Sequence, residues 1–297
     1  MPLALNAGRR HSSGNLSLPG LSVQKSILIT GCSSGIGADA ARGLAARGWR
    51  VFASCRQERD CAHLRAEGFE SPRIDYCDEE SIRSGLAEVL AATGGRLDAL
   101  FNNGAHQLAG LVEDLPRDGL RAIFEANLFG WHDLTRRVIP IMREQGQGRI
   151  VQCSSGLGLV ALRWRGAYVA TKFALEGLTD TLRAELSGSG IHVVLIEPGP
   201  ITTMFREKGI PHFERYIDWK GSVRRADYEA SLIPRMYRPG GRDMFELAPA
   251  AVTAKLLQAL EARNPRPRYY VTGATYIGGY LRRVLSTRMI DRIVTRL

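Results

Sequence analysis

The sequence predicts an α/β fold in which a doubly wound parallel sheet of about seven strands forms one domain. From Ser26 onward, short apolar runs alternate with longer segments of helical period, a pattern typical of repeated βαβ units around a buried sheet. A glycine-rich turn at 30–37 separates the first apolar run from the first helical segment. The chain has 297 residues, 44% hydrophobic and 24% charged, which suffices to bury one large core.

The elements follow from length and periodicity. Strands are expected where short apolar runs occur, at 26–30, 51–55, 73–76, 99–103, 149–155, 192–198 and 268–272. Helices are expected where apolar residues recur with helical period, near 36–47, 80–93, 118–144, 167–187 and 249–262. The alternation places helices on both faces of the sheet.

Three segments depart from this rhythm. Residues 1–25 have no clear period and are expected to form a mobile extension, which leaves 26–272 as the main domain. Residues 201–247 hold three prolines and seven aromatic residues, and we interpret this long insertion as a substrate lid. Residues 273–297 are predicted to form two basic amphipathic helices that divide at Ser286-Thr287, a pair able to cap the second helix.

The net charge of +10 is concentrated at the ends of the chain. Residues 1–25 carry three basic side chains and no acidic one, and residues 263–297 carry eight Arg and one Asp. The remainder holds 29 basic and 29 acidic residues, so a basic stripe on the folded module, and with it nucleic-acid binding, is not expected. The Arg-flanked apolar stripes of 278–297 suit peripheral contact with an anionic membrane, or packing on the body or on a second subunit.

Cysteine usage and the lack of long apolar runs bear on the compartment. The five cysteines are odd in number and lack metal-ligand spacing, so we expect reduced thiols and no metal site. No run of about eighteen apolar residues and no signal-peptide h-region occurs. We therefore expect a cytoplasmic protein, at most peripheral to the inner face of the membrane.

The glycine-rich turn TGCSSGIG has the features of a phosphate-binding loop. Its glycines let the backbone turn tightly and approach a pyrophosphate, while the following helix presents free N–H groups. A dinucleotide is therefore expected here on a Rossmann-type sheet, in contact with Thr30, Gly31, Ser33, Ser34, Gly35, Ile36 and Gly37.

The choice of dinucleotide depends on the end of the second strand. An acidic side chain there would bind the adenosine ribose of NAD, but this sequence has Cys55 followed by Arg56. A guanidinium can bind a 2′-phosphate, so NADPH/NADP+ is favoured over NAD(H). The alternative is that Arg56 is an ordinary surface residue.

Two Tyr-x-x-x-Lys pairs occur, Tyr168 with Lys172 and Tyr216 with Lys220. The first follows a strand that ends near Ser155, at the carboxyl edge where open α/β sheets bind ligands, whereas Tyr216 lies in the insertion and is expected to be a lid residue. Reduction of a carbonyl by a nicotinamide needs a proton donor, and a phenol serves when a neighbouring ammonium lowers its pKa. Tyr168 is therefore the expected acid–base, Lys172 supplies the charge, and the Ser155 hydroxyl stabilises the oxyanion.

These motifs, with NNGA at 102–105 and PGPITT at 198–203, resemble the short-chain dehydrogenase/reductase family over about residues 26–272. The resemblance implies that Asn127 completes a Ser-Asn-Tyr-Lys tetrad by holding a water through which Lys172 relays protons. It implies that Asp75 contacts adenine and that Thr203 binds the nicotinamide carboxamide. The family usually has Asn-Asn-Ala-Gly where this chain has NNGA. The further cofactor contacts that it implies are Asn103, Gly104, Tyr168, Lys172, Pro198, Gly199 and Ile201.

Within the family, SGLGLV, TKFALEGLTDTLRAEL and IEPGPITT resemble the hydroxysteroid and retinol dehydrogenase branch and bacterial NADP-dependent aldehyde reductases. This likeness implies an oxidoreductase that acts on an apolar aldehyde, ketone or alcohol, mainly as a reductase, with a homo-oligomer left open. The alternative is a catalytically silent dinucleotide-binding regulator or scaffold on the same fold. Such a module needs only the glycine turn, so the catalytic residues argue against it.

The aromatic residues of the insertion bear on the substrate. A pocket roofed by Phe205, Phe213, Tyr216 and Trp219 would suit an apolar molecule. The same side chains could instead form a satellite core beneath a long loop.

Overall fold

Six parallel strands form one sheet in the computed structural model, which describes residues 24–237 and 243–296. They are β1 (Ser26–Ile29), β2 (Arg50–Ala53), β3 (Ala99–Asn102), β4 (Gly148–Cys153), β5 (Ile191–Glu197) and β6 (Arg268–Tyr270). Their order is β2-β1-β3-β4-β5-β6, with every neighbouring pair parallel. The chain passes from β1 to β2, which pairs with one side of β1, and β3 then pairs with the opposite side of β1. The predicted doubly wound α/β sheet is confirmed, and its switch point lies between β1 and β3.

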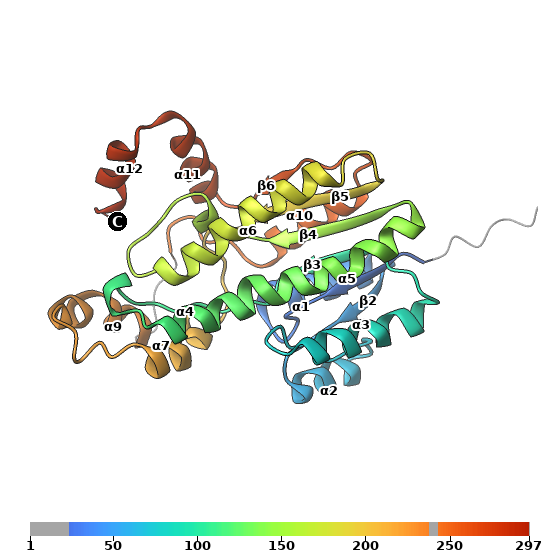
Figure 1. Ribbon diagram of the computed structural model, residues 1–297, viewed down its shortest axis with the longest axis horizontal. Coiled ribbons are helices and arrows are strands. Elements are labelled where there is room, and N and C mark those ends of the chain that lie inside the picture. The colour runs from blue at the N-terminus through green and yellow to red at the C-terminus, as the bar shows by residue number, and fades with distance from the viewer. Residues whose placement is uncertain (1–23, 238–242, 297) are drawn as a thin grey trace, which may run out of the picture.

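Helices cover both faces of the sheet (Figure 1). They are α1 (Gly35–Ala46), α2 (Glu58–Ala66), α3 (Glu79–Thr93), α4 (Arg117–Phe124), α5 (Gly130–Gln145), α6 (Gly166–Glu185) and α10 (Ala250–Glu261). Ile27 and Ile29 pack into the apolar cluster that contains α1 and α10, whereas Leu28 packs into the one that contains α3 and α5. This alternation follows from the two-residue period of a strand, and it explains why central strands are apolar throughout.

The expected strand at 73–76 is not formed. In this region the chain forms only two isolated bridges, Glu70 with Phe52 of β2 and Arg73 with Cys55 beyond the end of β2. Pro72 lies between these bridges and has no N–H with which to continue a ladder. Among the described residues the sheet therefore has one strand fewer than predicted.

Two helical segments also differ from the expectation. Helix α2 was not predicted, because only Cys61 and Leu64 on it are buried and it has almost no apolar period. The single helix expected at 118–144 consists of α4 and α5 joined by a π-helical turn over Glu125–Phe129. Such π turns inside helices are frequent at functional sites.

The insertion 201–247 starts and ends at one point of the body. Ile201 bridges Leu247, and the Thr202 N–H donates to the Leu247 carbonyl over 2.9 Å. The described part of the insertion contains α7 (Ile210–Tyr216), α8 (Arg225–Asp227), a π-helical turn (Tyr228–Leu232) and α9 (Ile233–Tyr237).

The aromatic residues of the insertion divide between two environments. Phe213 and Tyr228 are fully buried in a third apolar cluster, to which Tyr168 also belongs. Phe205 and Trp219 are only half-buried at the edge of that cluster. Phe213 therefore serves as satellite core and does not roof a pocket.

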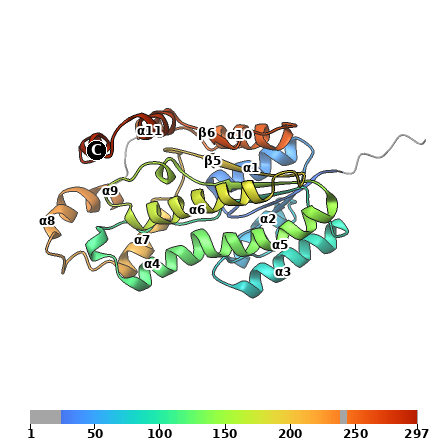
Figure 2. The same cartoon turned by 45° about the horizontal axis from the view of Figure 1, so that its top comes forward.

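The C-terminal helices, α11 (Gly273–Val284) and α12 (Thr287–Val294), lie away from the sheet (Figure 2). The predicted division at Ser286-Thr287 is confirmed. The expected side-chain cap is absent, because the Ser286 side chain makes no capping hydrogen bond. In the described ranges, no helix is both long and apolar enough to cross a bilayer. Most of the predicted N-terminal extension, 1–23, lies outside the described residues.

Candidate active site

The glycine turn has a shape that side chains would prevent. Gly31 has φ +69° and Gly35 has φ +58°, in the left-handed region that favours glycine. A Cβ on Gly31 would lie 2.5 Å from Gly104 Cα, and one on Gly37 would lie 2.3 Å from the Gly31 carbonyl oxygen. Side chains at these positions would therefore clash with backbone, and the tight turn at the start of α1 depends on glycine.

The loop after β3 holds the glycine turn in place. The Asn103 amide nitrogen donates to the Thr30 carbonyl over 3.0 Å, and the Asn103 backbone N–H donates to Thr30 Oγ1 over 2.9 Å. The Gly104 N–H donates to the same hydroxyl over 3.2 Å. Tyr76, which sequence reasoning missed, places its hydroxyl 2.6 Å from Thr30 Oγ1. The structure thus brings Thr30, Asn103 and Gly104 together at the switch point.

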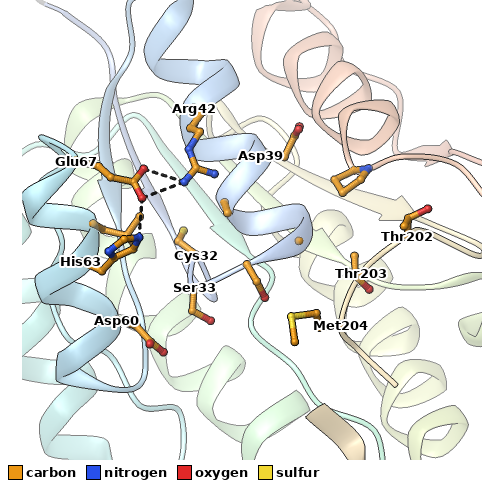
Figure 3. A pocket seen from close by; sticks show the side chains of 15 residues that line it. Cys32, Ser33, Asp39, Arg42, Asp60, His63, Glu67, Thr202, Thr203 and Met204 are labelled. Carbon is orange, nitrogen blue, oxygen red and sulfur yellow. Dashed lines mark hydrogen bonds and ion pairs between the residues drawn. The ribbon is translucent and has the colours of Figure 1, made fainter. Parts of the chain in front are cut away.

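A groove of about 690 Å³ opens beside this turn (Figure 3). Ser33, Ser34 and Gly35 line it together with Thr203, while charged side chains of α1 and α2 line its outer part. A Cβ on Gly35 would meet Thr203 Cγ2 at 2.9 Å, so the segment after β5 lies directly on the turn. The expected catalytic residues do not line this groove.

Arg56 and Asp75 lie outside that groove. Arg56 is exposed directly after β2, and no carboxylate of the described residues forms an ion pair with it. Asp75 accepts a hydrogen bond from the Cys77 N–H over 3.0 Å. Beneath Arg56, Cys55 is 1% exposed, and burial raises the pKa of its thiol to about 12. The Arg56 guanidinium is therefore available to an anion at the end of β2.

Lys172 is buried at the start of α6 with few partners. Its side chain is 1% exposed, and Nζ donates to the Cys153 carbonyl over 2.8 Å. Nζ also lies 4.2 Å from the centre of the Trp131 ring and 5.6 Å from that of Tyr168. Burial lowers the pKa of Lys172 to about 8, against the opposing effects of Cys153 and Glu176.

Tyr168 and Ser155 are neighbours. Burial raises the pKa of Tyr168 above its ordinary value, and the interaction with the Ser155 hydroxyl lowers it by less. The expectation that Lys172 gives Tyr168 a low pKa is therefore not met in this structure, because desolvation of the phenol dominates. Phe205 of the insertion packs edge-on against Tyr168, with ring centres 5.3 Å apart.

Asn127 lies within the π-helical turn and is fully buried. Its side-chain oxygen accepts from the His106 N–H over 3.1 Å, and its nitrogen donates to the His106 carbonyl over 2.8 Å. One turn further on, Trp131 donates to the Gly104 carbonyl over 2.8 Å. Trp131 therefore contacts both the loop after β3 and Lys172. It lies four residues after Asn127, a spacing that places both side chains on one helix face and that could have indicated this role.

The second Tyr-x-x-x-Lys pair has a different environment. Tyr216 packs against Gly119, where an added Cβ would lie 3.1 Å from Tyr216 Cβ. Tyr216 also lines a hollow of about 320 Å³ together with acidic side chains. Lys220 lies 5.7 Å from the Trp219 ring centre. The structure thus separates this pair from Ser155.

The segment after β5 passes close to Thr272, which follows β6. A Cβ on Gly199 would lie 2.1 Å from Thr272 Oγ1, so this close approach requires glycine at position 199.

All five cysteines are free, and four of them are buried. Within the described ranges, no group of three or more His, Cys, Asp or Glu residues is arranged to hold a metal ion.

A family model described as short chain dehydrogenase matches residues 25–212. The chain is 39% identical over 277 residues to the uncharacterized oxidoreductase YbbO of Escherichia coli K12, an alignment that covers 93% of this chain and 96% of the relative. The chain therefore belongs to the short-chain dehydrogenase family of oxidoreductases. It is also 33% identical to human 17-beta-hydroxysteroid dehydrogenase type 1, with 83% and 77% of the chains covered. Bovine retinol dehydrogenase 8 is 34% identical, with 81% and 79% covered.

Solved structures agree with this assignment. A short-chain dehydrogenase from Streptomyces avermitilis superposes with a TM-score of 0.70 at 29% identity, covering 92% of this chain and 94% of that one. A Burkholderia phymatum short chain dehydrogenase/reductase in complex with NAD has a TM-score of 0.69 at 25% identity, with 84% and 88% covered. A variant of actinorhodin polyketide ketoreductase with NADPH has a TM-score of 0.67 at 27% identity, with 85% and 97% covered. Nicotinamide dinucleotides thus occur on this fold in both forms.

Proposed function

We propose that this chain is an NADP(H)-dependent reductase of apolar aldehydes or ketones, retinoid- or steroid-like ones included. The observation that carries the proposal is the buried Tyr168 and Lys172 pair, beside Ser155 and at the same sheet edge as the glycine turn. The residues fit a dinucleotide. The Lys172 ammonium has three N–H donors, and its one hydrogen bond within the described ranges goes to Cys153, which leaves donors for ribose hydroxyls.

The proposed cofactor contacts follow the sheet edge from β1 to β5. The turn and the segment after β5 hold the phosphates and the nicotinamide, and Arg56 after β2, Asp75 before α3 and the loop after β3 hold the adenosine. These contacts are Thr30, Gly31, Ser33, Ser34, Gly35, Ile36, Gly37, Arg56, Asp75, Asn103, Gly104, Tyr168, Lys172, Pro198, Gly199, Ile201 and Thr203.

The bound cofactor supplies the hydride, and side chains of this chain handle the proton. Tyr168 donates its phenolic proton to the carbonyl oxygen, so its O–H bond breaks as the O–H bond of the alcohol forms. A raised pKa keeps this proton in place at neutral pH. Ser155 donates a hydrogen bond to the same oxygen, and the Lys172 ammonium, when protonated, stabilises the phenolate that remains. Asn127 fixes the backbone of His106 through two hydrogen bonds.

An apolar substrate is supported by two observations. Phe205 is half-buried against the Tyr168 ring, so it can contact a molecule bound there. Two relatives are named for hydroxysteroid and retinol substrates.

The direct test of the proposed function is consumption of NADPH with a medium-chain aldehyde, a retinaldehyde and a steroid ketone. A silent regulator would bind NADPH without turning over any of them.

The preference for NADP(H) over NAD(H) is tested by Arg56→Ala. NADPH binding should weaken by about 1–3 kcal/mol, because a charge-assisted hydrogen bond to the 2′-phosphate is lost, while NADH binding should change little. Titration of both reduced cofactors by protein fluorescence measures the two affinities. Equal losses for both would show that Arg56 does not select the cofactor.

A peripheral membrane contact is proposed for the C-terminal helices. Tyr280 and Val284 on α11 and Met289 and Ile293 on α12 are exposed, and the Arg residues of 282–296 flank them. Apolar side chains edged with arginine complement an anionic lipid surface. The full chain should co-sediment with vesicles that contain phosphatidylglycerol but not with phosphatidylcholine alone, and Arg282→Glu with Arg288→Glu should reduce this binding.

The outcomes of the vesicle experiment separate the occupants of this face. Equal binding to both kinds of vesicle, or to neither, would contradict the proposal. A change of oligomeric state in the double variant, measured by sedimentation velocity, would identify a second copy of the chain as the partner.

A further inference from the structure

Lys208, which the sequence motifs did not single out, reaches the glycine turn from the insertion. Its Nζ donates to Ser34 Oγ over 2.7 Å and lies 3.2 Å from Ser33 Oγ. These serines are more than 170 residues away in sequence. No carboxylate in the described part of the chain forms an ion pair with Lys208. Among the described residues, its ammonium therefore donates to two neutral hydroxyls and has no opposite charge paired with it.

The position of this ammonium is that of a phosphate ligand. Ser34 is the N-cap of α1, where free backbone N–H groups and the helix dipole favour an anion. An ammonium above such a terminus adds a like charge to it, an arrangement that an anion between them relieves. A lysine acts on phosphate as a point charge with rotatable donors, so Lys208 can turn from the hydroxyls to a phosphate oxygen without backbone movement.

Lys208 belongs to a short segment that also touches the catalytic side. Within 203–208, Thr203 packs on Gly35, Phe205 packs on Tyr168 and Lys208 contacts the serines of the turn. The same segment therefore connects the proposed phosphate site to the wall of the substrate site.

We infer that Lys208 binds the pyrophosphate of the dinucleotide, so that the cofactor fastens the segment 203–208 and completes the substrate site before the carbonyl enters. This inference rests on the proposed function. It concerns a cofactor ligand supplied by the insertion, in addition to those of the sheet edge.

The test compares Lys208→Met with Lys220→Met, since the insertion contains only these two lysines. Lys208→Met should weaken binding of NADPH and NADH alike, by about tenfold at low ionic strength and less at high salt, because both cofactors carry the pyrophosphate. Lys208→Arg should retain most of the affinity, and Lys220→Met should bind as the unaltered protein does. Lys208 is exposed, and an unchanged melting temperature without cofactor would show that the variant folds.

Hydrogen exchange gives a second readout. NADPH should slow exchange in 203–216 of the unaltered protein and do so much less in Lys208→Met. A segment as protected as the central strands before cofactor is added would contradict the lid.

Other affinities would overturn the inference in distinct ways. Unchanged affinity would show that Lys208 makes no phosphate contact, and tighter binding would show that it blocks the site. A loss for NADPH alone would move the contact to the 2′-phosphate. If the unaltered protein binds neither cofactor, the proposed function itself fails. If the unaltered protein and Lys208→Met bind the cofactors equally well, only the role of Lys208 is contradicted.

Discussion

Tyr168→Phe should lower turnover by about 10²–10⁴, the usual share of general acid catalysis, with cofactor affinity little changed. The substitution removes the proton donor and keeps the ring, which is 8% exposed within an apolar cluster. The fold should therefore be preserved. Steady-state kinetics with one accepted carbonyl substrate, together with NADPH titration, measure both quantities.

The second Tyr-x-x-x-Lys pair is the internal control for this experiment. Tyr216→Phe should change the apparent affinity for substrate at most, because Tyr216 lies against Gly119 and lines a different hollow. Lys220→Ala should have little effect. Near-normal turnover in Tyr168→Phe, or an inactive Tyr216→Phe, would contradict the assignment of the acid.

Lys172→Met should abolish most turnover and weaken cofactor binding, yet make the free protein less sensitive to pH. The variant loses the ammonium that stabilises the phenolate and the donors proposed to hold the ribose. Turnover should fall by about 10²-fold or more. A methionine fills nearly the same volume without the cost of burying a charge.

The sign of the pH effect follows from the lowered pKa of Lys172. Its pKa is about 8 in the folded protein and about 10.4 when the chain is unfolded. Between these pH values the unfolded chain binds more protons, so the free energy of unfolding rises with pH. Below pH 8 the buried ammonium carries its full cost, and above about pH 10.4 that cost has disappeared.

Denaturant unfolding at several pH values measures this effect. The unfolding free energy of the unaltered protein, minus that of Lys172→Met, should increase by about 2–3 kcal/mol from pH 7 to pH 10.5. Loss of the hydrogen bond to Cys153 changes the difference in unfolding free energy by the same amount at pH 7 and at pH 10.5. It therefore does not alter the dependence of this difference on pH. Lys220→Met, which alters an exposed lysine, should show no such slope. A flat difference for Lys172→Met would mean that the folded protein does not depress the pKa of Lys172.

Local sequence determined most of the elements and the motifs of the site. The glycine spacing at 31, 35 and 37 predicts a tight phosphate-binding turn, and the order of apolar and helical segments predicts a parallel sheet. Spacing within one helix likewise places Tyr168 and Lys172 on a common face. Such features involve neighbours along the chain, so sequence periodicity reveals them.

Burial and charge environment were decided by segments distant in sequence. Phe205 and Phe213 both belong to the insertion, but only Phe213 is fully buried in the third apolar cluster, while Phe205 remains half-buried beside Tyr168. The pKa of Tyr168 is raised because the fold removes water around it, a cost that a nearby lysine in the sequence does not reveal. Lys208 reaches Ser34 only because Ile201 and Leu247 bring both ends of the insertion back to the sheet edge. Contact across such separations depends on packing of the whole chain, which no local pattern encodes.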